Sequence, residues 1–223
     1  MPFDSIHGVF GPEYDPSNED ETIRRKAIEA YRLEGDLAVK LGGFSVVAHP
    51  APMAVDPNSM AKESQLARMD PMRKTIRELA DIGQNLGVTY LIENVPASYQ
   101  FGSDVFQLAQ MVRELDHPNV RICFDVGHAH MTGKAPAALE GCLDVVAYVH
   151  VHDNDGKSDS HGIPGEGSLP WDQLQPVMAK AKINLPAMLE LFISEQRLEQ
   201  LIADGLGHNL NTWMALNSHG TSD

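Results

Sequence analysis

The sequence predicts an α/β domain with a central parallel sheet, and three features of the chain favour this fold class. Six short apolar runs, rich in Val, Ile and Leu, alternate with longer stretches in which apolar residues have helical spacing. The apolar runs lack the polar alternation of a half-exposed sheet, as is typical of parallel strands buried on both faces. No linker or low-complexity segment interrupts the alternation, so we expect residues 1–223 to form a single domain.

The strands and helices are expected to alternate along the whole chain. The predicted strands are Ser5–Phe10, Phe44–His49, Val88–Glu93, Val120–Asp125, Val145–His152 and Pro186–Phe192. The predicted helices are Glu19–Leu41, Asn58–Leu86, Asp104–Leu115, Pro136–Leu143, Trp171–Ala181 and Glu195–Leu216. Pro71 predicts a break or kink in the second helix. Six units are two fewer than a (β/α)8 barrel of the TIM type requires, so either the first two units are missing or the barrel is incomplete.

The composition limits the class of function. With 223 residues, 43% of them hydrophobic and 22% charged, the chain has the make-up of a soluble globular protein. Its net charge of −14 disfavours a general nucleic-acid binder, because binding phosphates requires a basic surface. No segment approaches the roughly 20 apolar residues of a membrane span, and the N-terminus lacks a signal-peptide pattern. Cys123 and Cys142 form no CxxC pair and indicate a reducing compartment, so we expect a cytoplasmic protein.

Residues that commonly bind metals stand where the predicted strands end. They are His49, Glu93, Asp125, His128, His150, His152, Asp153 and Glu190, and His7 lies in the first strand. In parallel α/β folds, catalytic groups collect at the carboxyl ends of the strands. Burying several unpaired carboxylates would cost several kcal/mol each, and a divalent cation removes that cost. The sequence therefore predicts a divalent-metal site, whose carboxylate and imidazole ligands suit Mn, Mg, Co or Zn.

The carboxylates and one imidazole are the main candidate ligands. We expect Glu93, Asp125 and Glu190 to bind the metal, with structural hydrogen bonding as the alternative. His150 and His152 stand two residues apart and share one face of a strand. One of them would bind the metal and the other the substrate, and we favour His150 as the ligand.

The remaining histidines and a long polar loop supply further candidates. His128 follows Asp125 by three residues and would contact either the metal or the substrate. For His7 and His49, metal binding and a structural role are equally open. The loop from Asp153 to Pro170 contains Asp159 and His161 two residues apart, directly after a strand with candidate ligands, so this pair is a further candidate for metal binding.

Several motifs in a fixed order resemble those of a known family. They are VVAHP, LIENVP, ICFDVGHAH, YVHVHDNDGKSDSHGIPGEGSLPW and MLELF, and they extend from His7 to about Phe192. In this respect the chain resembles the xylose isomerase-like TIM barrels. That superfamily includes sugar phosphate isomerases and epimerases, and also the endonuclease IV type of apurinic endonuclease.

The isomerase and epimerase branch implies one divalent metal and a small carbohydrate substrate. The resemblance implies that Glu93, Asp125, His150 and Glu190 hold this metal, with His128 near the substrate. Glu93 and Glu190 would also be the catalytic acid and base on opposite sides of a bound ketose. This is the function that we favour from the sequence.

The endonuclease branch implies a hydrolase of phosphoesters with two or three zinc ions. Its ligands would be His7, His49, Glu93, Asp125, His128, His150, Asp159, His161 and Glu190, and all nine positions carry the required residue type. The net charge of −14 and the lack of a basic or aromatic stripe argue against DNA. A third hypothesis is an inactive barrel that serves as a binding subunit. Exposed sheet edges invite pairing with another chain, so the edges would be covered either by the C-terminal helix or by a partner subunit in a homo-oligomer.

Overall fold

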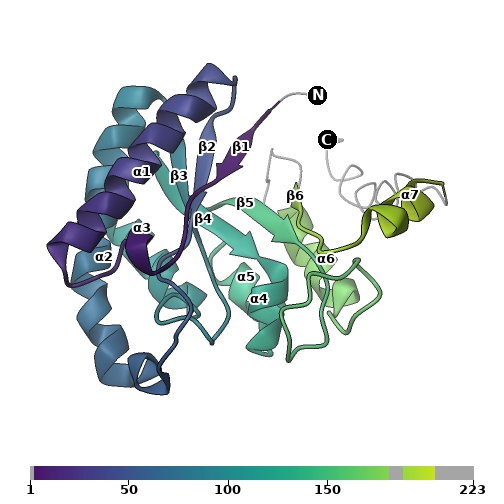
Figure 1. Cartoon of the computed structure of the whole chain (residues 1–223). Helices are drawn as coiled ribbons and strands as arrows, with labels where there is room; N and C mark the ends of the chain where they lie inside the picture. The colour runs from purple at the N-terminus through teal and green to yellow at the C-terminus, as the bar shows by residue number, and fades with distance from the viewer. Residues whose placement is uncertain (1–2, 181–187, 204–223) are drawn as a thin grey trace.

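Six parallel strands form one sheet in the computed structural model, which describes residues 3–180 and 188–203 (Figure 1). The strands are β1 (Ser5–His7), β2 (Ser45–Ala48), β3 (Thr89–Glu93), β4 (Val120–Asp125), β5 (Val146–Val151) and β6 (Met188–Leu189). Each strand pairs in parallel with the next along the chain. The predicted α/β fold with a parallel, barrel-like sheet of six strands is therefore confirmed.

Helices connect the strands and cover the outer face of the sheet. The α-helices are α1 (Glu21–Lys40), α2 (Lys62–Leu86), α3 (Val105–Leu115), α4 (Val126–Met131), α5 (Ala135–Glu140), α6 (Trp171–Lys180) and α7 (Glu195–Ala203), and short 3-10 helices span Pro12–Tyr14 and Pro57–Met60. Figure 1 shows α1 and α2 side by side along the outer face. The main hydrophobic core lies between these helices and the strands. Among the described residues, no helix has the length and apolar character needed to cross a membrane.

The inner face of the sheet holds a second, smaller apolar layer. It consists of Val47, Leu91, Cys123 and Tyr148, one residue from each of the strands β2 to β5. Because side chains alternate across a strand, the residue two positions further on points to the same face. Those residues are His49, Glu93, Asp125 and His150. The strand period thus places four polar side chains directly above an apolar floor.

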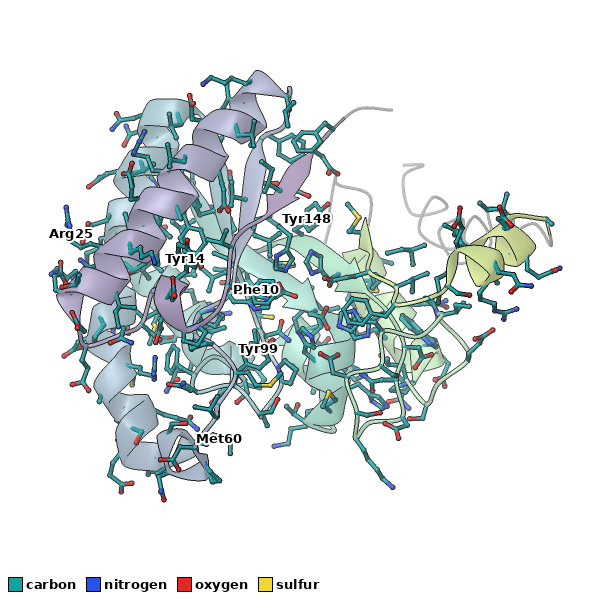
Figure 2. The ribbon with its side chains drawn as sticks, in the orientation of Figure 1. Phe10, Tyr14, Arg25, Met60, Tyr99 and Tyr148 are labelled. Atoms are coloured by element: carbon teal, nitrogen blue, oxygen red, sulfur yellow. The ribbon has the colours of Figure 1, made fainter. Side chains whose placement is uncertain are left out.

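The sheet curves, so that side chains from distant strands meet on its inner face. The hydroxyl of Tyr148 on β5 lies 3.0 Å from Ser5 Oγ on β1, and Figure 2 labels Tyr148 beside both strands. A register shift between β4 and β5 pairs Ile122 with Val146 but Cys123 with Tyr148. This bulge brings Asp125 opposite His150, so both reach the same level of the sheet.

The structure differs from the sequence prediction at two helices. The predicted break at Pro71 is not found, because α2 continues through it from Lys62 to Leu86. A proline removes one intrahelical hydrogen bond, but the turns that follow bury Met72 and Ile76 in the core and stabilise the helix. The sequence also fails to predict the short helix α4. It begins directly after β4, because the Asp125 side chain accepts a hydrogen bond from the backbone N–H of His128 and caps it.

Several predicted boundaries differ by a few residues. The strand predicted for Ser5–Phe10 ends at His7, and the helix predicted for Pro136–Leu143 is shorter and begins at Ala135. The predicted start of the sixth strand at Pro186 and the predicted end of the last helix lie outside the described residues. The expectations of a single domain and of two missing units stay predictions.

Candidate metal centre

The polar side chains at the carboxyl ends of the strands converge in three groups of carboxylates and imidazoles that have the composition of metal sites. Within each group the nitrogen and oxygen atoms that would bind an ion lie within 4.8 Å of one another. The first group is Glu93, Asp125, His150 and Glu190; the second is His128, His152, Asp159 and His161; the third is His7, His49 and Glu93. The ten residues that the sequence assigns to the metal or the substrate all belong to these groups.

Three carboxylates and one imidazole form the first group. His150 Nδ1 lies 2.9 Å from Glu93 Oε1, 3.0 Å from Glu190 Oε2 and 3.9 Å from Asp125 Oδ2. Glu93 and Asp125 are completely buried. Within the described part of the chain, Asp125 Oδ2 and Glu190 Oε2 accept no hydrogen bond. Converging buried carboxylates with free oxygens fit a divalent cation, which would offset their repulsion and their loss of hydration.

Glu93 also belongs to the third group, through its other oxygen. Its Oε2 lies 3.5 Å from His7 Nε2 and 3.3 Å from His49 Nε2. One carboxylate is thus shared between two groups, one oxygen to each. Such an arrangement fits either two ions bridged by Glu93 or one ion beside two imidazoles that donate hydrogen bonds.

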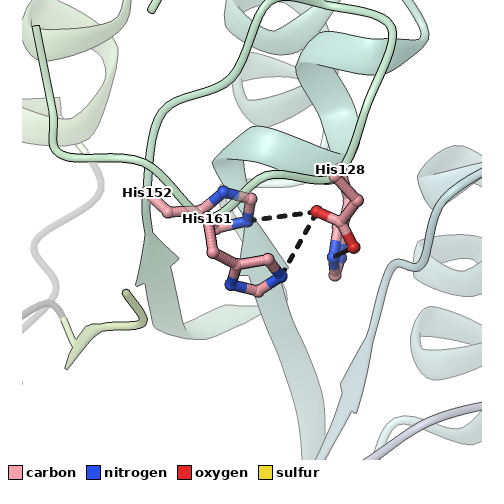
Figure 3. A group of neighbouring side chains, drawn as sticks. His128, His152 and His161 are labelled. Atoms are coloured by element: carbon pink, nitrogen blue, oxygen red, sulfur yellow. Dashed lines mark ion pairs between the residues drawn. The ribbon is translucent and has the colours of Figure 1, made fainter. Parts of the chain in front are cut away.

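Three imidazoles face one carboxylate in the second group (Figure 3). Asp159 Oδ2 lies 3.3 Å from His128 Nε2, and Asp159 Oδ1 lies 3.2 Å from His161 Nε2 and 3.9 Å from His152 Nε2. Asp159 and His161 come from the loop that follows β5, whereas the other two histidines come from α4 and the end of β5. Imidazole-rich groups of this kind suit Zn²⁺ better than Mg²⁺.

Backbone carbonyls fix the tautomers of three of the histidines. In each of them the ring nitrogen Nδ1 faces a backbone carbonyl oxygen. His128 Nδ1 lies 2.8 Å from the carbonyl oxygen of Asn94. His161 Nδ1 lies 3.0 Å from that of Glu190, and His7 Nδ1 lies 3.1 Å from that of Gly8. Nδ1–H therefore donates, and Nε2 turns toward the carboxylates. Metal-binding histidines commonly have this arrangement, because the outer hydrogen bond leaves the inner lone pair free.

The charges of the groups are strongly coupled. Burial lowers the pKa of His128, but the carboxylates of Asp125, Asp159 and Glu93 outweigh burial and raise this pKa to about 10. Burial raises the pKa of Glu93, but His150, His49 and His7 hold it well below its ordinary value. The carboxylates thus retain positive charge on the neighbouring imidazoles. A divalent ion would replace those protons.

Two further residues support the groups: Asn94, which sequence reasoning missed, and Asp153, which it expected among the ligand types. Asn94 is buried, and its side-chain amide donates to the carbonyl of Asp125 and accepts from the backbone N–H of Asp125. Asp153 stands among the predicted ligand types but belongs to none of the three groups. Its carboxylate accepts from the backbone N–H groups of Asn154, Leu169 and Gly165 and from the indole N–H of Trp171, at 2.7 to 3.1 Å. Asp153 therefore anchors the loop that carries Asp159 and His161.

Aromatic side chains lie beside the imidazoles of the groups. The ring of Phe10 lies 4.9 Å from the ring of His49, and the ring of Tyr99 lies 5.5 Å from the ring of His49. Figure 2 labels Phe10 and Tyr99. Phe192 stacks on His161 at 4.0 Å. Phe10 and Phe192 are 57% and 71% exposed, so they present apolar surface beside the metal-type groups. No pattern in the sequence indicates this role, since isolated aromatic residues are ordinarily core residues.

Comparison with known proteins identifies relatives over most of the chain. Residues 4–211 match the family model described as Xylose isomerase-like TIM barrel. The uncharacterized protein MJ1311 of Methanocaldococcus jannaschii is 27% identical over 168 residues, which cover 74% of this chain and 56% of that protein. The fructoselysine 3-epimerase of Escherichia coli O157:H7 is 23% identical over 168 residues, which cover 74% and 58%. The chain thus spans less than two thirds of the length of these curated relatives.

Solved structures share the fold. A D-tagatose 3-epimerase-like protein superposes with a TM-score of 0.81 and 21% identity, covering 98% of this chain and 79% of the other. The 3-keto-D-glucoside 4-epimerase YcjR from E. coli gives a TM-score of 0.78 and 17% identity, covering 93% and 78%. These similarities confirm the TIM-barrel-like architecture.

Proposed function

Because the chain belongs to the xylose isomerase-like TIM barrel family, we propose that it is a divalent-metal-dependent isomerase or epimerase of a sugar or sugar phosphate. The carboxylates of Glu93 and Glu190, 2.9 and 3.0 Å from the same nitrogen of His150, carry this proposal. Two carboxylates that face one small space can remove a proton from one side of a ketose and return it from the other. The relatives named as 3-epimerases support the same class of reaction.

The first group would hold one ion, with Mn, Mg or Co favoured by its three carboxylates. Asp125 Oδ2 and Glu190 Oε2, which accept no hydrogen bond from any described residue, support this assignment. A bound divalent ion would polarise the carbonyl of the substrate and so acidify the neighbouring C–H bond.

The two glutamates would have different surroundings during the reaction. Glu93 is completely buried and is held by three histidines, so its carboxylate is fixed in position. The side chain of Glu190 is 26% exposed, which leaves it accessible to a substrate. The exposed ring of Phe10 would offer an apolar surface to the carbon face of a sugar.

Substitution of each glutamate by glutamine tests the proposal. Both Glu93→Gln and Glu190→Gln should lower turnover by about 10²- to 10⁴-fold, the usual contribution of a general acid or base. Turnover is measured by NMR as exchange of a substrate hydrogen with deuterated water, over a panel of ketoses and their phosphates. Glu140→Gln is the matched control, because Glu140 is exposed on α5 and pairs only with Lys180 among the described residues. A Glu93→Gln/Glu190→Gln protein with full activity would refute the proposal.

A second candidate function is supported by the other two groups. With the second and third groups also filled, the chain would hold three zinc ions, as in a phosphoester hydrolase that acts on abasic DNA. The net charge of −14 weighs against a DNA substrate. Three zinc ions per chain, together with nicking of a duplex that contains an abasic site, would favour the hydrolase. One ion per chain with exchange activity would favour the isomerase or epimerase.

A further inference from the structure

The imidazole of His152 contacts both the first and the second group. Its Nε2 lies 3.0 Å from Asp125 Oδ1, and its ring stacks on the ring of His161 with 3.9 Å between centroids and 7° between planes. The side chain is completely buried. In Figure 3 the rings of His152 and His161 lie one above the other. A residue in this place is poorly suited to contact a substrate directly.

We propose that His152 is a positioning residue that orients Asp125 in the first group and His161 in the second. The inference rests on the proposed metal centre. It assigns His152 a role different from the substrate contact expected from sequence, and it names the interactions through which the two groups depend on one side chain.

Asp125 shows how one oxygen is held so that the other is free. Its Oδ1 accepts from the backbone N–H of His128 at 2.7 Å and from His152 Nε2 at 3.0 Å. Its Oδ2 accepts no hydrogen bond within residues 3–180 and 188–203. Two donors on Oδ1 prevent rotation of the carboxylate, so Oδ2 stays directed toward the other side chains of the first group. Groups that hold a ligand in this way commonly change metal affinity when they are removed.

His161 depends on the stack because its backbone is strained. Its φ of +46° lies in the left-handed region, which non-glycine residues adopt rarely. The ring is held between His152 on one side and Phe192 on the other, at 3.9 and 4.0 Å. This three-ring stack, together with the hydrogen bond from Nδ1 to the carbonyl of Glu190, directs His161 Nε2 toward Asp159.

The same geometry argues against His152 as a ligand of the second group. The lone pair of an imidazole nitrogen lies in the plane of the ring, so two parallel rings 3.9 Å apart direct their lone pairs side by side rather than at one point. His152 Nε2 is also nearer to Asp125 than to Asp159, at 3.0 against 3.9 Å. The ring edge at Cε1 faces Gly127, where an added Cβ would lie 2.5 and 2.6 Å from Nδ1 and Nε2, so the backbone of α4 leaves little space beside either nitrogen.

Two substitutions separate the two interactions. His152→Gln keeps a side-chain N–H at the position of Nε2 but removes the ring. His152→Phe keeps a ring for the stack but removes the donor. Each is combined with His49→Gln, which weakens the third group, and either with Asp159→Asn, which disables the second group, or with Glu190→Gln, which weakens the first. The dissociation constant of the group left intact is then measured by calorimetry with Mn²⁺ or Zn²⁺. His117→Gln, at the opposite end of β4, is the control.

We expect His152→Phe to weaken Mn²⁺ binding at the first group by about 10- to 100-fold, and to leave Zn²⁺ binding at the second within about threefold. His152→Gln should show the reverse order. If the His152→Phe protein does not fold, the His152→Gln protein alone provides the test, because its metal binding should be weakened only at the second group. Unchanged binding at both groups, or equal loss at both, would overturn the inference while the metal centre stands. A parent protein that binds neither ion would refute the proposed function itself.

Discussion

Gly127 makes room for the ring of His152, so Gly127→Ala tests how firmly this ring is held. A Cβ at position 127 would overlap the Cε1 atom of His152 and lie 2.5 and 2.6 Å from its two nitrogens. The ring cannot shift slightly to make space, because it is completely buried and stacks on His161. We therefore expect the ring to leave its position, which would break its hydrogen bond to Asp125 and its stack on His161.

The expected magnitude is the sum of these two interactions, corrected for helix propensity. A hydrogen bond to an ionised carboxylate contributes roughly 1.5–3 kcal/mol, and a stacked ring pair about 0.5–1.5 kcal/mol. Position 127 lies in α4, where alanine is favoured over glycine by about 1 kcal/mol. The net loss in the free energy of unfolding should therefore be about 1–3.5 kcal/mol.

Urea unfolding of the chelator-treated protein measures this loss. The matched control is the Gly127→Ala/His152→Ala protein, in which the added methyl group meets no ring. This double variant should be no less stable than His152→Ala alone, because the loss of stability in Gly127→Ala comes from the clash between the added methyl group and the His152 ring. Gly127→Ala as stable as the parent, or more stable through its higher helix propensity, would refute the reasoning.

Three further outcomes are expected. Asp153→Asn should lower the free energy of unfolding by about 1–3 kcal/mol, because the amide cannot accept all four hydrogen bonds that the carboxylate accepts. Limited proteolysis should then cut the chain within residues 153–170, and a loop that stays uncut would contradict this expectation. In the metal-free protein, the raised pKa of His128 stabilises the fold fully below pH 6.5, and this contribution disappears as the pH rises toward 10. Thermal unfolding should show the loss, and His128→Gln should reduce the slope. The part that remains comes from His7, His150 and His161, whose pKa values the neighbouring carboxylates also raise. Metal binding must displace the same proton, so Zn²⁺ affinity in a calorimetric titration should rise over this pH range, and a flat profile would contradict the assignment of His128.

The strand pattern explains why so much of the site could be predicted. Apolar residues such as Leu91 fix the inner face of each strand, and the polar residue two positions later must share that face. Parallel strands bring these ends together, so the order of His49, Glu93, Asp125 and His150 along the chain is enough to gather them. The prediction required no knowledge of the loops.

Features that depend on loop geometry or tertiary packing could not be predicted. The cap that Asp125 provides for α4 requires its side chain to turn back toward the backbone of His128, which no periodicity reveals. The four donors around Asp153 come from positions up to 18 residues away. The bulge that aligns Asp125 with His150 leaves no mark on the apolar pattern of β5. Pro71 shows the converse, a strong local signal that packing of α2 outweighs.

The sharing of Glu93 connects the two candidate functions. Its Oε1 faces His150 and its Oε2 faces His7 and His49, so each oxygen of the carboxylate lies beside at least one imidazole. Those imidazoles keep the pKa of Glu93 well below its ordinary value, which makes it a weak base but a carboxylate that stays ionised and able to bind a cation. The more exposed Glu190 is therefore the better candidate for taking a proton from a sugar. Filling the third group would engage both oxygens of Glu93 and leave it only as a bridge between ions. The number of ions bound beside Glu93 therefore decides whether its surroundings support isomerisation or epimerisation of a sugar, or hydrolysis of a phosphoester.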